Sequence, residues 1–176
     1  MSSRFERLGA ETVHEAKIFT VTRERFRHED GEEVEREIVR HEGAVGIVAH
    51  DGEHVWLVRQ PREAPGVPDL LEVPAGKLDE EGEDPLQTAQ RELAEEIGKA
   101  AAHWEPLHEF FSSPGFTDEK VFLFLATGLS DRSAETEENE RIDIVPWPLE
   151  RLDDAIAECR DSKSLIGLLL LKLRLR

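Results

Sequence analysis

The chain has a single cysteine, Cys159, and this scarcity excludes an intramolecular disulfide and any metal site built from several thiolates. A packed thiol is a commoner role for such a residue than a nucleophile. Long hydrophobic runs are also missing. Residues 165–171, LIGLLLL, are too short to span a bilayer, and Lys172 and Arg174 interrupt the segment that follows. Because the residues after Met1 are polar and charged, we expect a cytoplasmic location and no membrane partner.

Positive charge is scarce as well, since 22 Lys and Arg residues stand against 39 Asp and Glu residues, a net charge of −17. This excess argues against nonspecific binding to nucleic acid and against attraction to anionic membranes. A substrate that carries phosphates would be repelled at long range unless metal ions screen it locally. A length of 176 residues, 39% of them hydrophobic, suits a globular chain with a substantial core.

One helix is strongly signalled in the middle of the chain. Asp84 can cap its N-terminus, Pro85 suits the first helical position, and Gln87 completes a capping-box pattern. Gly98 supplies the stop. Apolar residues recur at spacings of three and four, so one stripe faces a core: Leu86, Ala89, Leu93 and Ile97.

Four glutamates lie on this helix or just ahead of it: Glu83, Glu92, Glu95 and Glu96. Like charges three or four residues apart destabilise a bare helix by about 0.2–0.5 kcal/mol per pair. A divalent cation would turn that repulsion into coordination, because Mg²⁺ takes oxygen ligands and often bridges to substrate phosphates. From charge alone, however, a solvated acidic face is the commoner explanation.

The order of the residues favours the metal site. Residues 91–98 read RELAEEIG. Glu83 lies eight residues before Arg91, and Gly76 lies further upstream. This arrangement closely resembles the Nudix box, a loop–helix–loop pattern of Gly, Glu and Arg-Glu-aliphatic-x-Glu-Glu-x-Gly. Two departures stand out. Six residues rather than the usual five separate Gly76 from Glu83, and Lys99 stands where an aliphatic residue is usual.

Extended segments are predicted at residues 18–21, 34–39, 44–49, 55–58, 70–73, 107–111, 121–126 and 142–147. The first two flank the polar turn HEDGEE as a hairpin, and Asp51-Gly52 marks another tight turn. Helices are predicted at residues 148–160 and from residue 162, with Asp161 or Ser162 as the cap of the second. Strands around a central helix, with helices closing the chain, indicate an α+β or α/β sandwich.

The resemblance implies the same fold class in more detail, α/β (α+β), as a Nudix-type α/β/α sandwich with a mixed sheet over residues 41–176. Residues 1–40 resemble the extra N-terminal antiparallel sheet of the ADP-ribose pyrophosphatase subgroup. In that subgroup the sheet commonly takes part in a homodimer, so we expect residues 1–40 to be a dimerisation sheet.

Segments outside the box favour this subgroup. Pro114 lies fifteen residues after Lys99, and a proline at that place is a marker of the subgroup. The family's diadenosine-polyphosphate marker is a downstream tyrosine, and this chain has none. The resemblance therefore implies metal-dependent hydrolysis of ADP-ribose to AMP and ribose 5-phosphate. The alternatives are another nucleoside diphosphate sugar such as GDP-mannose, or a dinucleotide. A Nudix module that senses ADP-ribose without cleaving it is a further alternative, although such modules usually lose box glutamates.

The resemblance also assigns roles to residues. The Ala75 carbonyl, Glu92 and Glu96 are expected to hold Mg²⁺ or Mn²⁺. Glu83 and Glu95 are expected as accessory ligands, and Arg91 as the residue that orients the glutamates by ion pairing. Substrate contacts are expected from four residues: Phe19, Arg36, Arg62 and Gly76. For Arg62 the reason is chemical too, because a guanidinium forks well onto phosphate oxygens.

Hydrolysis also needs a base that activates water. In the ADP-ribose subgroup the base comes from a loop after the box, and residues 138–142, ENERI, resemble that element. Glu140, two residues before Ile142, has the matching register. Glu138 is the second candidate in the loop, and Glu95 is the alternative within the box, since some other Nudix enzymes use a box glutamate.

Overall fold

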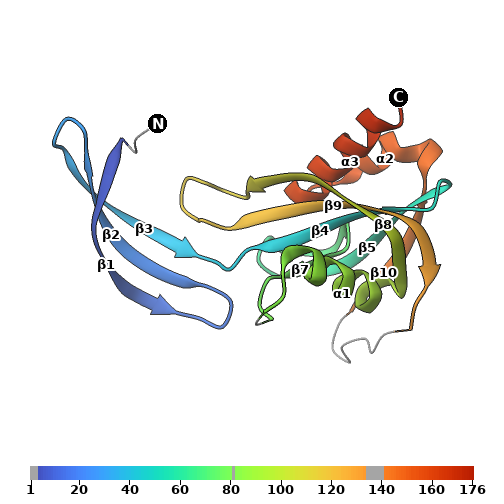
Figure 1. The fold of residues 1–176 in the computed structure, drawn as a ribbon, viewed down its shortest axis with the longest axis horizontal. Coiled ribbons are helices and arrows are strands. Elements are labelled where there is room, and N and C mark those ends of the chain that lie inside the picture. The colour runs from blue at the N-terminus through green and yellow to red at the C-terminus, as the bar shows by residue number, and fades with distance from the viewer. Residues whose placement is uncertain (1–3, 81, 134–140) are drawn as a thin grey trace. The chain divides into compact units, whose positions relative to one another are not determined.

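The structure, a computed structural model, describes residues 4–80, 82–133 and 141–176. Its elements in chain order (Figure 1) are β1 (Phe5–Glu15), β2 (Thr20–His28), β3 (Glu33–Arg40), β4 (Ala44–His50), β5 (His54–Arg62), β6 (Val67–Glu72), β7 (Ala75–Lys77), α1 (Pro85–Ile97), β8 (Lys99–Phe111), β9 (Lys120–Asp131), β10 (Asp143–Pro148), a 3₁₀ helix (Leu149–Arg151), α2 (Leu152–Glu158) and α3 (Ser162–Arg174). These elements form two compact units. Met1–Gly43 with Phe111–Lys120 make the first unit, and Ala44–Phe110 with Val121–Arg176 make the second.

The first unit contains an antiparallel sheet in the order β1-β2-β3. The predicted turn HEDGEE is confirmed between β2 and β3, where Gly31 has a φ of 87° that favours glycine. Ile18 and Phe19, predicted as strand, instead lie in the turn between β1 and β2. The sequence analysis missed β1, because its residues are mostly exposed and show no alternation of apolar and polar side chains.

A buried carboxylate also stabilises the first unit. Glu24 on β2 is fully buried and pairs with Arg40 at the end of β3. The Nη1 atom of Arg40 reaches Asp118 Oδ2 at 2.9 Å, and Asp118 Oδ1 accepts the backbone N–H of His41 at 3.0 Å. Residues 111–120 are thereby fixed to the end of this sheet, with Pro114 among them.

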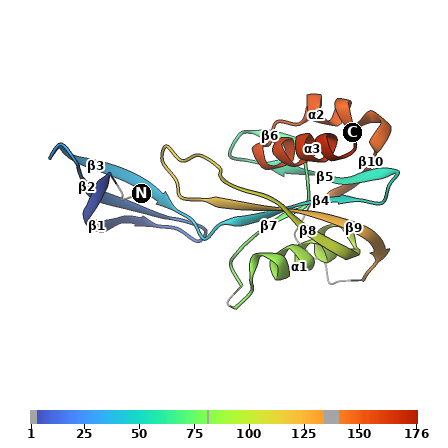
Figure 2. The same cartoon turned by 45° about the horizontal axis from the view of Figure 1, so that its top comes forward.

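The second unit is built on a mixed sheet in the order β10-β5-β4-β9-β8, to which β6 adds on β5 and β7 adds on β4. β4 and β9 run parallel, whereas β5 is antiparallel to β4, β6 and β10, and β7 is antiparallel to β4. Figure 2 shows α1 on one face of the sheet and α2 with α3 on the other. The expected α/β/α sandwich with a mixed sheet is therefore confirmed.

Successive side chains of strand β4 point to opposite faces of the sheet and so contribute to two hydrophobic cores. Val45 and Ile47 face α1 and pack in one core with Leu93, whereas Val48 faces α3 and packs in the other core with Leu168. The segment AVGIVA thus reads as a strand buried on both faces. Gly167 brings α3 close to the sheet, since a Cβ there would lie 2.7 Å from Val48 Cγ2.

The ends of several elements differ from prediction, most clearly those of β8 and α2. Strand β8 starts at Lys99, directly after the helix, rather than at residue 107. The predicted helix over residues 148–160 is a 3₁₀ turn followed by the shorter α2. The start of α3 is as predicted, and of the two predicted caps the structure shows Asp161. Within the described ranges, every helix is too short or too polar to pass through a bilayer.

Candidate active site

Helix α1 starts and stops where its sequence dictates. The Asp84 carboxylate accepts the Gln87 backbone N–H at 2.9 Å, and the Gln87 side chain accepts the Asp84 backbone N–H at 2.9 Å. Such a cap contributes about 1 kcal/mol to a helix. Gly98 ends the helix in the left-handed conformation, with a φ of 65°. Because these caps fix where the helix begins and ends, they also fix the direction in which its glutamates point.

Arg91 lies at the centre of three of the four glutamates. Its Nη1 atom lies 2.9 Å from Glu92 Oε1 and 2.9 Å from Glu95 Oε2, and its Nε lies 3.3 Å from Glu83 Oε2. Burial alone would lower the pKa of Arg91, but the charges of these three carboxylates raise that pKa above its ordinary value. The cluster thus contains its own permanent cation.

Two carboxylates converge on the bend that leads into β7. Glu96 is only 7% exposed, and its Oε2 accepts the Ala75 backbone N–H at 3.0 Å. The carboxyl of Glu92 lies against Gly76, where a Cβ would collide with it. A side chain at residue 76 would therefore displace the Glu92 carboxyl from its observed place. The structure thus brings together four of the expected site residues: Ala75, Gly76, Glu92 and Glu96.

The donors at this bend suit a hard divalent cation, because they are carboxylate and backbone oxygens without sulfur or imidazole. No group of three His, Cys, Asp or Glu side chains within the described part of the chain is arranged to hold a metal ion. Apart from the accessory glutamates, the expected ligands are two side chains, Glu92 and Glu96, and the carbonyl of Ala75. The residues present therefore fit such a cation through two carboxylates and the backbone.

Arg62, at the end of β5, is anchored by a buried partner. Its Nε and Nη2 atoms lie 2.6 and 3.0 Å from the two carboxylate oxygens of Glu72, which is 1% exposed. The hydrogen bond to Glu72 raises the pKa of Arg62 despite its burial, and the charge of Glu96 contributes. The side chain of Arg62 is 40% exposed. Arg62 therefore lies within electrostatic reach of Glu96.

Two residues that the sequence analysis did not single out help to hold the site. Thr88 on α1 is fully buried and its hydroxyl donates to Glu83 Oε2 at 3.0 Å. Glu72 binds Arg62 in the two-pronged geometry described above. A buried threonine five residues after Glu83, and a glutamate just before the bend, were available signals. In the sequence alone, each looks like an ordinary residue of a helix or strand, because its partner is not visible there.

The remaining expected residues are not part of the second unit's described structure. Phe19 and Arg36 belong to the first unit, where the Phe19 ring contacts His14 and Arg36 donates to the Glu35 carbonyl. Glu140 and Glu138 lie outside the described residues.

Lys99, the departure from the aliphatic residue of the box, packs over the Trp56 ring at 4.4 Å and pairs with Asp131. Its stem covers apolar surface much as an aliphatic residue would.

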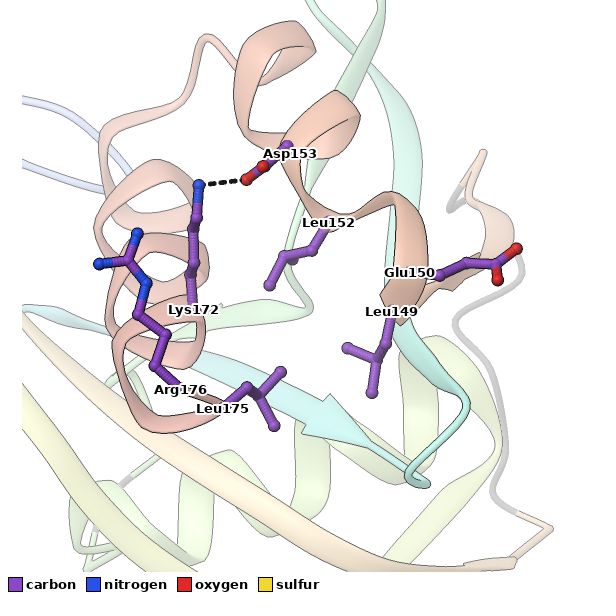
Figure 3. Close-up of a pocket in the computed structure, with 7 residues that line it drawn as sticks. All are labelled: Leu149, Glu150, Leu152, Asp153, Lys172, Leu175 and Arg176. Carbon is purple, nitrogen blue, oxygen red and sulfur yellow. Dashed lines mark ion pairs between the residues drawn. The ribbon is translucent and has the colours of Figure 1, made fainter.

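A cavity of about 220 Å³ lies at a different place, between the 3₁₀ helix, α2 and the end of α3 (Figure 3). Figure 3 shows three leucines gathered there and an ion pair between Lys172 and Asp153. The residues that line it are Leu149, Glu150, Leu152, Asp153, Lys172, Leu175 and Arg176. None of the expected site residues is among them, so this cavity is not the predicted site.

Comparison with known proteins relates the site to a family. Residues 40–164, which include all of the glutamate-bearing segment, match the profile described as NUDIX domain. An "ADP-ribose pyrophosphatase" of Mycobacterium tuberculosis is 43% identical over 80% of this chain and 68% of its own length. Another, from Bacillus subtilis, is 38% identical over 81% of this chain and 78% of its own length.

Two further similarities extend this result. A "Methanol dehydrogenase activator" of Bacillus methanolicus is 40% identical over 82% of this chain and 80% of its own length. Among solved structures, one described as "Crystal structure of ADP compounds hydrolase" superposes with a TM-score of 0.86 at 26% sequence identity. That match covers 98% of this chain and 95% of the solved chain. The similarity therefore extends over the N-terminal strands as well as the sandwich.

Proposed function

The chain belongs to the Nudix family and is a Nudix hydrolase, and from this premise we propose that it hydrolyses ADP-ribose to AMP and ribose 5-phosphate. The observation that carries the proposal is the convergence of Glu92 and Glu96 on the Ala75–Gly76 bend. The choice of ADP-ribose is supported by the names of two relatives and by Pro114.

The proposed chemistry is attack of water on one phosphorus of the diphosphate, with cleavage of the bridging P–O bond. Mg²⁺ or Mn²⁺, bound by the Ala75 carbonyl, Glu92 and Glu96, would supply positive charge to the phosphate oxygens. Glu96 also holds the Ala75 N–H and so fixes the bend that bears the carbonyl.

Three residues outside the cation ligands would orient the carboxylates, bind the substrate and accept a proton. Arg91 holds Glu83, Glu92 and Glu95 in place. The Nη1 edge of Arg62 is directed by Glu72 and can donate to a phosphate oxygen. We assign the general base to Glu140, whose carboxylate would take the proton of the attacking water.

A panel of nucleoside diphosphate derivatives tests the substrate. With Mg²⁺ or Mn²⁺ present, ADP-ribose is expected to yield AMP and ribose 5-phosphate in equal amounts, as identified by chromatography. GDP-mannose and NAD⁺ are the matched competitors, and a Glu96→Gln preparation controls for contaminating hydrolases. A higher kcat/KM for either competitor would move the assignment to that substrate. Tight ADP-ribose binding without turnover would indicate a sensing module instead.

The first unit is proposed to be part of a homodimer interface. The described residues of this unit form a three-stranded sheet and no helix, and its exposed apolar side chains include Phe5, Val13 and Ile18. A small sheet of this kind needs something that covers its apolar side chains.

We expect the full-length chain to sediment as a dimer, and a variant without residues 1–40 to be a monomer with little activity. A monomeric full-length protein at micromolar concentration would exclude this assembly.

Phe19 and Arg36 remain proposed contacts to adenine and ribose-phosphate. Phe19→Ala is expected to raise KM rather than lower kcat.

A further inference from the structure

Residues 72–75 run from the last residue of β6 through the bend to the first residue of β7. Each of them contacts a group from another element. The Pro74 carbonyl accepts the backbone N–H of Ile47 on β4 at 2.8 Å. The backbone N–H of Ala75 donates to Glu96 Oε2 on α1 at 3.0 Å. Two of the four contacts therefore come from the sheet and from the glutamate-bearing helix. The other two come from α3, which carries none of the residues assigned above.

Ser164 at the start of α3 holds the backbone of this bend. Its Oγ accepts the backbone N–H of Val73 at 2.8 Å, and Ser164 is fully buried. The same hydroxyl donates to Asp161 Oδ2 at 2.5 Å, and that oxygen also caps the Ser164 backbone N–H at 3.0 Å. Because the hydroxyl hydrogen is used by Asp161, the lone pairs of Oγ are fixed toward Val73.

Lys163, the next residue toward the N-terminus of α3, holds the side chain at the start of the bend. Its Nζ lies 2.5 Å from Glu72 Oε2 and 2.9 Å from Asp161 Oδ2. Glu72 is 1% exposed and also carries the two bonds to Arg62. Lys163, Glu72 and Arg62 thus form a continuous chain of ion pairs from α3 to the exposed guanidinium.

The position of Lys163 is unfavourable for the helix itself. A cation in the first turn opposes the positive end of the helix dipole, which favours anions there. Burial would lower the pKa of Lys163, but the charges of Asp161 and Glu72 raise it above the ordinary value. Removing one partner of such a buried pair leaves an uncompensated charge. The lysine is therefore explained by its partners and not by the helix.

We propose that Ser164 and Lys163 are positioning residues of the hydrolytic site. Ser164 fixes the Ala75 carbonyl through Val73, and Lys163 fixes the Arg62 guanidinium through Glu72. The inference rests on the proposed function for the roles of Ala75 and Arg62. It predicts two separable defects, one in cation binding and one in phosphate binding, from adjacent residues of one helix.

Ser164→Ala tests the first role, and Ser162→Ala is the matched control because Ser162 is an exposed serine in the same helix turn. Mn²⁺ binding to the full-length protein is measured by titration calorimetry without substrate. Ser164→Ala is expected to weaken Mn²⁺ about tenfold, the effect typical of residues that orient metal ligands. Ser162→Ala is expected to bind Mn²⁺ like the wild type. Equal Mn²⁺ affinity in both variants would refute the role of Ser164.

Lys163→Met tests the second role, with Lys172→Met as the control, since Lys172 pairs with the exposed Asp153 at the other end of α3. The readout is the affinity for α,β-methylene ADP-ribose, an analogue that resists cleavage, together with KM and kcat. Lys163→Met is expected to raise Kd and KM about tenfold, the effect of losing one charge-assisted contact, while kcat and Mn²⁺ affinity change little. A fall in kcat with unchanged KM would contradict this role.

Asp161→Asn is a further test, which applies if Ser164→Ala or Lys163→Met unfolds the protein. Asp161→Asn retains a capping side chain but removes the charge that holds both Ser164 and Lys163. It is expected to show both defects, and wild-type values for Mn²⁺ and analogue would overturn the proposal. If the wild type fails to hydrolyse ADP-ribose, the proposed function fails. The Mn²⁺ comparison of the two serine variants still decides the role of Ser164.

Discussion

Glu96→Gln is expected to lower kcat for ADP-ribose more than about a hundredfold, because it removes a charged ligand oxygen from the proposed cation site. The amide keeps the size of the side chain and can still accept the Ala75 N–H, so the bend should stay in place. Glu92→Gln is expected to behave in the same way, since Mg²⁺ binds neutral amides weakly.

The measurement is kcat as a function of Mg²⁺ concentration, with Mn²⁺ binding as a second readout. Glu150→Gln is the control, since this exposed carboxylate lies in the 3₁₀ helix and outside the site. Near-normal turnover of Glu92→Gln or Glu96→Gln at low Mg²⁺ would defeat the ligand assignment for that residue.

Glu140→Gln is expected to lower kcat by about 10²–10⁴, the range for removing a positioned proton acceptor. KM for ADP-ribose and Mn²⁺ affinity should barely change, because the residue contributes chemistry and not binding. Glu138→Gln, two residues away in the same segment, is the matched control and is expected to be mild.

The opposite pattern at Glu138 and Glu140 would show that the register of the base is wrong by two residues. If both variants are mild and Glu95→Gln is inactive, the base lies in the box. In the structure, Glu95 Oε2 accepts a hydrogen bond from Arg91 at 2.9 Å.

Local signals in the sequence predicted the central part of the molecule well. Asp84, Gln87 and Gly98 define the ends of α1 through contacts within a few residues, and the structure shows those contacts. The segment AVGIVA predicted β4 because it is buried on both faces. Where the information is local, or where burial is complete on both sides, a pattern of residue types is enough.

Signals that depend on distant partners were missed. β1 exists because β2 pairs with it over its length, and its own residues show no alternation that would mark a strand. The polar start of β8, KAAAHWEP, is likewise not a strand pattern on its own. Ser164 and Lys163 contact residues about ninety positions earlier in the chain, as the separation of 91 residues from Val73 and Glu72 shows. Only the unfavourable charge at the start of α3 was visible in advance.

Arg91 gives the carboxylate cluster a built-in counter-ion, and this bears on how the apoprotein behaves. Glu83, Glu92 and Glu95 are already paired with it, so their mutual repulsion is offset before any cation arrives. Chelation is therefore expected to inactivate the enzyme reversibly without unfolding it, unlike small domains whose fold depends on a metal. Exchange of cations on an intact scaffold would let the free divalent ion concentration set the rate of turnover.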